Sequence, residues 1–98
     1  MDELKNGEQI DMEIKRLRRD IKKDYDIIKK GVVPQIAVPH LERIIRNYNK
    51  IYSMRKPILS DKMGFATLKI QYKTLCAIAH VKPQRFDDAE ELKLEKPQ

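Results

Sequence analysis

Apolar residues recur every three or four positions through the first third of the chain. From residue 8 to residue 30 these steps follow the heptad pattern of a helix with one apolar seam. Acidic residues crowd the first turns, Lys29 and Lys30 suit the negative helix end, and Gly31 follows as a C-terminal cap. The pattern predicts one long helix over residues 8–30. Asp24 occupies a seam position that otherwise carries Ile10, Ile14, Leu17, Ile21 and Ile28.

Two prolines mark the next segment. Val32 to Pro39 is expected to be an extended connection, since each proline disfavours helical backbone at the preceding residue. Proline is tolerated at the first helical position, so the second helix is predicted to begin near Pro39 and to run to about residue 55. Its apolar face collects Leu41, Ile44, Ile45, Tyr48, Ile51 and Tyr52 at helical spacing.

A third helix is predicted over residues 60–80, with Ser60 as its N-cap. It carries apolar residues on two sides, so we expect it to be the central helix of the fold. Alternatively, residues 59–75 form a helix-turn-helix that turns at Gly64. One stripe consists of Phe65, Leu68, Tyr72, Leu75 and Ala79, and the other of Met63, Ile70 and Ile78.

These elements predict an all-α fold: a small three-helix domain over residues 1–85, followed by a flexible acidic tail over residues 86–98. Ninety-eight residues are enough for one modest core. No apolar run approaches the roughly 20 residues of a membrane span, and no apolar leader opens the chain. Cys76 is the single cysteine, which excludes an internal disulfide. We therefore expect a cytoplasmic or otherwise intracellular protein without a membrane partner.

The charge distribution narrows the choice of partner. Residues 31–85 hold ten Lys/Arg and only two acids, Glu42 and Asp61, whereas both ends of the chain are acidic. Solvated surfaces usually mix the two signs, so a basic body favours a polyanionic or acidic partner.

The predicted second helix places a basic face opposite its apolar one. Arg43, Arg46 and Lys50 could hold phosphates there, and Asn47 is the candidate for reading a base edge. The prediction is a non-enzymatic, regulatory or accessory protein that binds nucleic acid, DNA rather than RNA. The supporting cations are Lys62, Lys69, Lys73, Arg16 and Arg19.

Two further interpretations stay open. The protein is alternatively an adaptor or inhibitor, of a kind that would suit a virus or mobile element, docking on an acidic protein through Tyr48, Tyr52 or Arg55. The heptad seam from Ile10 to Ile28 is a homodimer interface of coiled-coil type, the packing surface for the other two helices, or both, because so short a chain leaves apolar surface uncovered.

Catalysis and cofactor binding are not expected. The carboxylates concentrate at the chain ends, and three isolated glycines cannot build a phosphate-binding loop. Cys76 and His80 would supply only two metal ligands. We therefore expect no enzyme, no metal or other cofactor and no small-molecule substrate.

Overall fold

Three α-helices, packed side by side, build the described part of the protein. The structure is a computed structural model that describes residues 7–84 and residue 86. Helix α1 spans Gly7–Lys29, α2 spans Pro34–Met54 and α3 spans Leu59–Ala79. The all-α, three-helix prediction is confirmed, and the predicted bounds of the first and third helices are correct to within one residue. The predicted acidic tail lies outside the described residues, apart from Phe86.

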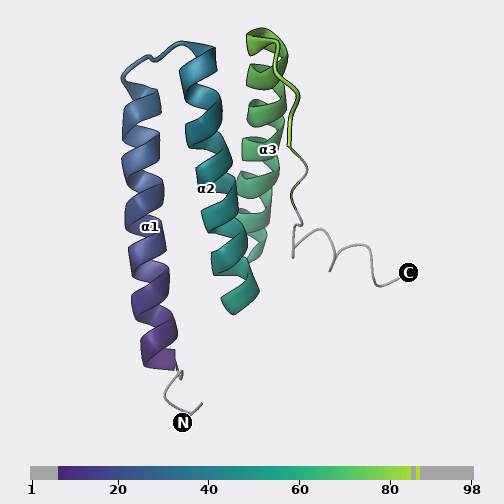
Figure 1. Cartoon of the computed structure of the whole chain (residues 1–98). Coiled ribbons are helices and arrows are strands. Elements are labelled where there is room, and N and C mark those ends of the chain that lie inside the picture. Colours follow the sequence, from purple (N-terminus) through teal and green to yellow (C-terminus); the bar gives the residue numbers. More distant parts are fainter. Residues whose placement is uncertain (1–6, 85, 87–98) are drawn as a thin grey trace, which may run out of the picture.

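Helix α1 ends where the sequence predicts. Gly31 adopts a φ of 90°, in the left-handed region that glycine enters without strain. Its N–H donates to the carbonyl of Ile28 at 3.0 Å, which satisfies one of the carbonyls left open at the helix end. The chain then reverses direction and enters α2 (Figure 1).

The predicted extended segment before Pro39 is wrong, because α2 begins at Pro34. Pro34 takes the first helical turn, where its missing N–H has no partner to lose, and Val33 before it is extended. Pro39 therefore lies inside the helix. It removes the N–H that would bond to the carbonyl of Gln35, which lies in an exposed turn that water can reach. Burial of Ala37 and Val38 offsets that loss.

Helix α2, and not α3, is the central helix. It packs against α1 on one side and α3 on the other, whereas α1 and α3 hardly touch (Figure 1). Leu41, Ile44 and Ile45 are accordingly almost completely buried. Because α3 has one neighbour, it buries one of its two apolar stripes and leaves Met63, Ile70 and Ile78 exposed.

Helix α3 is continuous, so the helix-turn-helix alternative is wrong. Gly64 lies inside the helix, and open space surrounds the position of a side chain there. The predicted cap at Ser60 is also wrong, since the helix begins one residue earlier. Asp61 accepts a hydrogen bond from the N–H of Ile58 at 3.3 Å and so satisfies a donor at this end.

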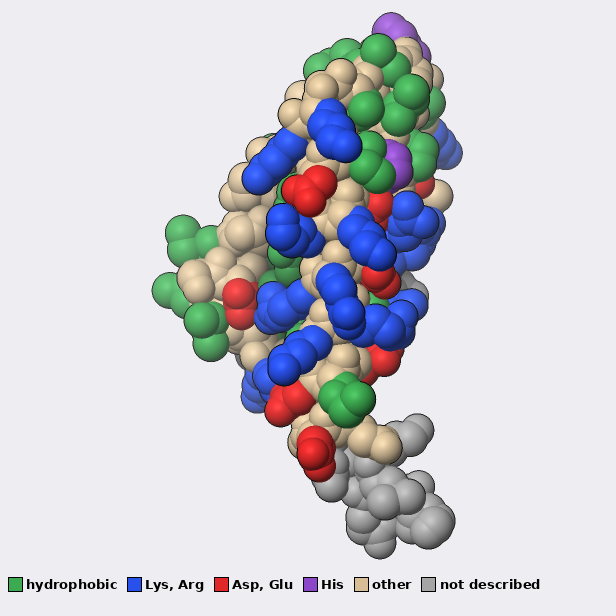
Figure 2. Space-filling model, turned by 90° about the vertical axis from the view of Figure 1, so that its left-hand side faces the viewer, with side chains coloured by type: hydrophobic (Ala, Val, Ile, Leu, Met, Phe, Trp, Pro, Cys, Tyr) green, Lys and Arg blue, Asp and Glu red, His purple; other side chains and the backbone are tan. Residues whose placement is uncertain are grey.

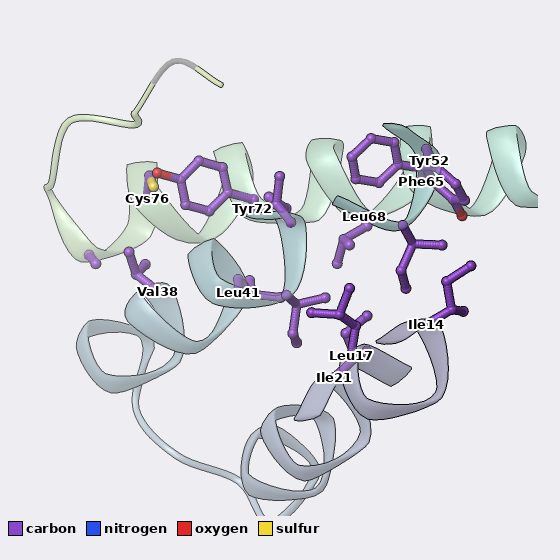
Figure 3. Close-up of a cluster of buried hydrophobic side chains, with 14 residues drawn as sticks. Ile14, Leu17, Ile21, Val38, Leu41, Tyr52, Phe65, Leu68, Tyr72 and Cys76 are labelled. Atoms are coloured by element: carbon purple, nitrogen blue, oxygen red, sulfur yellow. The ribbon is translucent and has the colours of Figure 1, made fainter. Parts of the chain in front are cut away.

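The hydrophobic core joins side chains of all three helices, as Figure 3 shows. Tyr52 and Phe65 meet edge to face with ring centres 5.4 Å apart. The Tyr72 hydroxyl donates to Glu42 and accepts from the N–H of Gln84, both at 2.8 Å, which fastens the segment after α3 to the bundle. None of the helices in the described ranges is both long and apolar enough to cross a membrane.

The heptad seam of α1 serves the protein's own core. Ile14, Leu17 and Ile21 are buried within the monomer, and Ile10 and Ile28 pack at its margin. This packing agrees with the intramolecular interpretation. Ile14, Leu17 and Ile21 are covered in the monomer, so the homodimer predicted through the seam stays a prediction that only Ile10 and Ile28 could serve from partly open positions.

Candidate nucleic-acid interface

The basic face predicted on α2 is largely occupied by contacts within the protein. Arg43 forms a two-pronged pair with Asp24 of α1, from Nε to Oδ2 and from Nη2 to Oδ1, each at 3.0 Å. His40 Nδ1 lies 2.9 Å from the same carboxylate. Asp24 itself is only 2% exposed. The residue that interrupts the heptad is thus a buried acid that ties α1 to α2.

The charges around Asp24 keep it ionised. Burial alone would raise the pKa of Asp24, but hydrogen bonds from Arg43 and His40, together with the charge of Arg43, outweigh that effect. The pKa of Asp24 therefore lies below its usual value, and the same pair raises the pKa of Arg43. The guanidinium of Arg43 is consequently engaged by Asp24 in a structural ion pair, and phosphate would have to share it.

The other three residues of the predicted α2 face are placed differently from one another. Arg46 donates to Gln84 at 2.7 Å and stacks over the ring of Phe86. Asn47 is 7% exposed, so the expectation that it reads a base edge is wrong. Lys50 is exposed. Asn47 stands on the flank of α2 that α1 covers, because the central helix has less solvent surface than an isolated amphipathic helix would have.

The predicted α3 lysines line up along their helix but do not join the basic residues of α1. Lys62, Lys69 and Lys73 recur at helical spacing. Lys69 Nζ stands 4.9 Å from the centre of the Phe65 ring. Helices α1 and α3 lie on opposite sides of α2 (Figure 1), so these cations belong to a different edge of the bundle.

The densest positive surface is the solvent side of α1. We call it the α1 basic face and define it by six exposed residues: Lys15, Arg16, Arg18, Arg19, Lys22 and Lys23. They fall within nine consecutive positions, about 12 Å along the helix axis. Figure 2 looks at this side of the molecule and shows Lys and Arg side chains gathered along the middle of it, with acids between them and hydrophobic side chains above and to the left.

Several cations of this face form no ion pair with another residue that the structure describes. Arg16 pairs with Glu13 and approaches Asp20 at 3.9 Å, and Lys22 approaches Asp26 at 3.4 Å. For Lys15, Arg18, Arg19 and Lys23, no ion pair occurs within the described part of the chain. Of the predicted α1 ligands, Arg19 is therefore available, whereas Arg16 is shared with Glu13.

Of these six residues, the sequence analysis named only Arg16 and Arg19 as nucleic-acid ligands. The positions of all six could have been predicted, because burying the seam against α2 leaves the opposite side of α1 facing water. The three residues predicted to anchor an acidic protein partner all have contacts within the protein. Tyr52 is buried, the half-buried Tyr48 stacks on it with ring centres 5.7 Å apart, and the exposed Arg55 pairs with Asp11.

Nothing in residues 7–84 and 86 gathers three or more metal-ligating side chains at one place. Cys76 is buried, while His80 is exposed at the end of α3. No protein-family model, no curated protein and no solved structure matches this chain. The proposal below rests on the geometry and charge of the molecule itself.

Proposed function

We propose that this protein is a non-enzymatic nucleic-acid-binding protein, with a regulatory or accessory role, and that it holds duplex DNA against the α1 basic face. The observation that carries the proposal is the cluster of Lys15, Arg18, Arg19 and Lys23, exposed and without ion pairs among the described residues. Such a cluster repels itself unless a polyanion neutralises it, which favours a ligand of dense negative charge.

The mechanism is electrostatic. A duplex presents about one negative charge per 1.7 Å of its axis, so several phosphates lie within reach of a face about 12 Å long. Each neutralised phosphate releases condensed counterions, and this release drives binding. The face carries Lys and Arg but no Asn or Gln, so we expect phosphate contacts with little sequence preference.

The shape of the bundle favours DNA over RNA. Helix α1 forms one edge of the bundle, with its basic side turned away from α2 (Figures 1 and 2). The major groove of B-DNA is about 12 Å wide and accepts a helix, whereas that of A-form RNA is too narrow. An edge helix can approach such a groove without its neighbours colliding with the backbone.

The test is a fluorescence-anisotropy titration of a labelled duplex over a series of salt concentrations. Four or five phosphate contacts predict a slope of log K against log salt near about −4. Replacing Arg18, Arg19, Lys22 and Lys23 by Ala should weaken binding by at least about tenfold and flatten the slope by about one for each lost contact.

A matched variant separates a specific face from overall charge. Replacing Lys56, Lys62, Lys73 and Lys82 by Ala removes the same charge from other parts of the surface. Its affinity should stay close to that of the wild type. Equal weakening by both variants would show that net charge alone attracts the duplex, and an affinity indifferent to salt would refute the proposal.

A further inference from the structure

The solvent side of α3 is apolar along most of its length. Leu59, Met63, Ile70 and Ile78 are each more than half exposed. Their steps of four, seven and eight residues place them on one side of the helix. Ala66, Thr67, Thr74 and Ala77 lie between them, and residues 62–79 contain no acid. A solvated helix face normally carries mixed charges, and a continuous exposed apolar face marks a contact surface.

This face continues into a groove between the two outer helices. Tyr25 and Ile28 of α1, Leu41 of α2, and Ile70 and Leu75 of α3 line a hollow of about 370 Å³. Tyr25 also borders a second hollow of about 390 Å³, which extends the groove along α1 towards Tyr48. The groove exists because α1 and α3 pack against α2 but hardly against each other.

The α1 margin of the groove is positive. Its lining residues there include Arg18, Lys22 and Lys29. On α3, Lys62, Lys69 and Lys73 stand on the flank turned away from the groove, where Lys69 lies over the ring of Phe65. The acid that lines the groove, Asp26, already faces Lys22 at 3.4 Å. An occupant of the groove would therefore meet apolar side chains in the middle and cations along its α1 side.

The charge pattern selects the occupant. A second copy of the chain, with its formal charge of +6, would bring further cations against Arg18, Lys22 and Lys29. A helix with an apolar stripe, and with carboxylates along the flank that faces α1, would instead complement the surface. The geometry points to a docking site for an acidic amphipathic helix of a partner protein, which lies in the α1–α3 groove as a fourth helix of the bundle.

This site differs from the DNA-binding face in what it requires. It depends on Ile70, Leu75 and Tyr25, none of which belongs to the α1 basic face, although Arg18 and Lys22 border both surfaces. Substitutions at the apolar positions therefore test docking separately from DNA binding.

The experiment selects helices from a displayed library. The library consists of peptides of about 20 residues, long enough to span about 30 Å. Each carries Leu, Ile or Met at the apolar heptad positions and Glu, Gln or Lys at the flanking ones. Selection on the wild-type protein should enrich Glu on the flank that faces α1. Enrichment of Lys on that flank, or the absence of any preference there, would overturn the proposal.

Two matched variants then locate the bound peptide. Ile70→Glu places a charge inside the groove, whereas Met12→Glu places the same charge at a similarly exposed apolar position of α1, with exposures of 65% and 67%. A selected Glu-flanked peptide should bind Ile70→Glu about tenfold or more weakly. It should bind Met12→Glu as it binds the wild type. Equal effects of the two variants would refute the groove as the site.

Three further measurements on the wild type and the two variants test folding, self-association and DNA binding. Circular dichroism should show the same thermal transition for both variants, since both positions are exposed. If sedimentation finds a wild-type dimer that Ile70→Glu dissociates, a second copy occupies the groove and the proposal is wrong. Ile70→Glu should bind duplex DNA as the wild type does, so failure of the docking site leaves the DNA-binding proposal to its own test. Met12→Glu places a carboxylate one turn before Arg16 of the α1 basic face and should bind duplex DNA more weakly.

Discussion

The two outer helices pack against the same partner but meet the solvent in opposite ways. Helix α1 presents six Lys and Arg side chains, whereas α3 presents Leu59, Met63, Ile70 and Ile78. Each of these helices needs only one apolar stripe to pack against α2, so folding does not determine which residues occupy the rest of its surface. The comparison teaches that the core specifies the bundle, whereas the outer faces are not fixed by the core and differ in their chemistry.

The buried sides of these two helices differ as well. Helix α3 meets α2 through aromatic rings, including Phe65 against Tyr48 and Tyr52. Helix α1 meets α2 through aliphatic side chains and the ionised Asp24 with His40 and Arg43. The first interface depends mainly on the packing of rings, whereas the second contains a buried ionised carboxylate whose pKa is lowered, so we expect the stability contributed by the second to depend on pH.

The largest expected effect comes from the aromatic interface. Phe65→Ala should lower the free energy of unfolding by about 3–5 kcal/mol, because it opens a cavity among the rings of Tyr48 and Tyr52. Urea denaturation followed by circular dichroism measures this loss. Met63→Ala, two residues away on the solvent side, should change it by no more than about 0.5 kcal/mol. Similar losses for both would mean that the two sides of α3 do not differ as described.

The next effect belongs to the ionic interface. Asp24→Asn should destabilise the protein by about 1–3 kcal/mol at neutral pH, since a buried charged acceptor is lost from Arg43 and His40. The folded pKa of Asp24 lies below its unfolded value of about 3.9, so its contribution is complete above that pH. It is lost as the pH falls through the folded pKa.

Urea unfolding between neutral pH and pH 2 measures this linkage. The free energy of unfolding of the wild type should exceed that of Asp24→Asn at neutral pH, and the difference should disappear as the solution becomes acidic. Asp26→Asn, which alters an exposed pair with Lys22, should stay within about 0.5 kcal/mol of the wild type. Parallel curves for wild type and Asp24→Asn would show that the carboxylate at position 24 contributes nothing through its charge.

Substitutions of two glycines, one in α3 and one at the end of α1, compare the two outer helices further. Gly64→Ala should stabilise α3 by about 0.5–1 kcal/mol, because the site is helical and nothing lies within 4 Å of the added Cβ. Gly31→Ala should destabilise the end of α1 by about 1 kcal/mol, since its φ of 90° strains any residue with a Cβ. Thermal unfolding of both variants measures the two shifts, which should have opposite signs. Equal shifts would contradict the caps and helix bounds described above.

The smallest effect on stability is expected on the exposed face of α3. Replacing Ile70 and Ile78 by Gln should alter the free energy of unfolding by less than about 0.5 kcal/mol, because both side chains already face water. It should reduce the fluorescence of a bound apolar dye. Replacing Arg18 and Arg19 of α1 by Gln should leave dye binding unchanged. A loss of stability without a loss of dye binding would place these isoleucines in the core.

The sequence by itself determined the three helices, because helical periodicity is a local property of the chain. The steps of the α1 seam, the stop at Gly31 and the stripe from Phe65 to Ala79 each depend on neighbours within a few positions. The start of α2 was missed because Pro34 and Pro39 are both tolerated in a first turn. The burial of Val38 favours a helix that begins at Pro34 over one that begins at Pro39, and this burial depends on residues far along the chain.

Only the tertiary structure decided which helix is central and which charges are available. Asp24 meets His40 and Arg43 across 16 and 19 residues, and the burial of Asn47 depends on the approach of α1. An amphipathic pattern states that one side of a helix is buried, but it does not state how many neighbours bury it. With two neighbours, α2 buries Asn47 and engages Arg43 and Arg46 in contacts within the protein, while α1 and α3, with one neighbour each, keep their outer surfaces open.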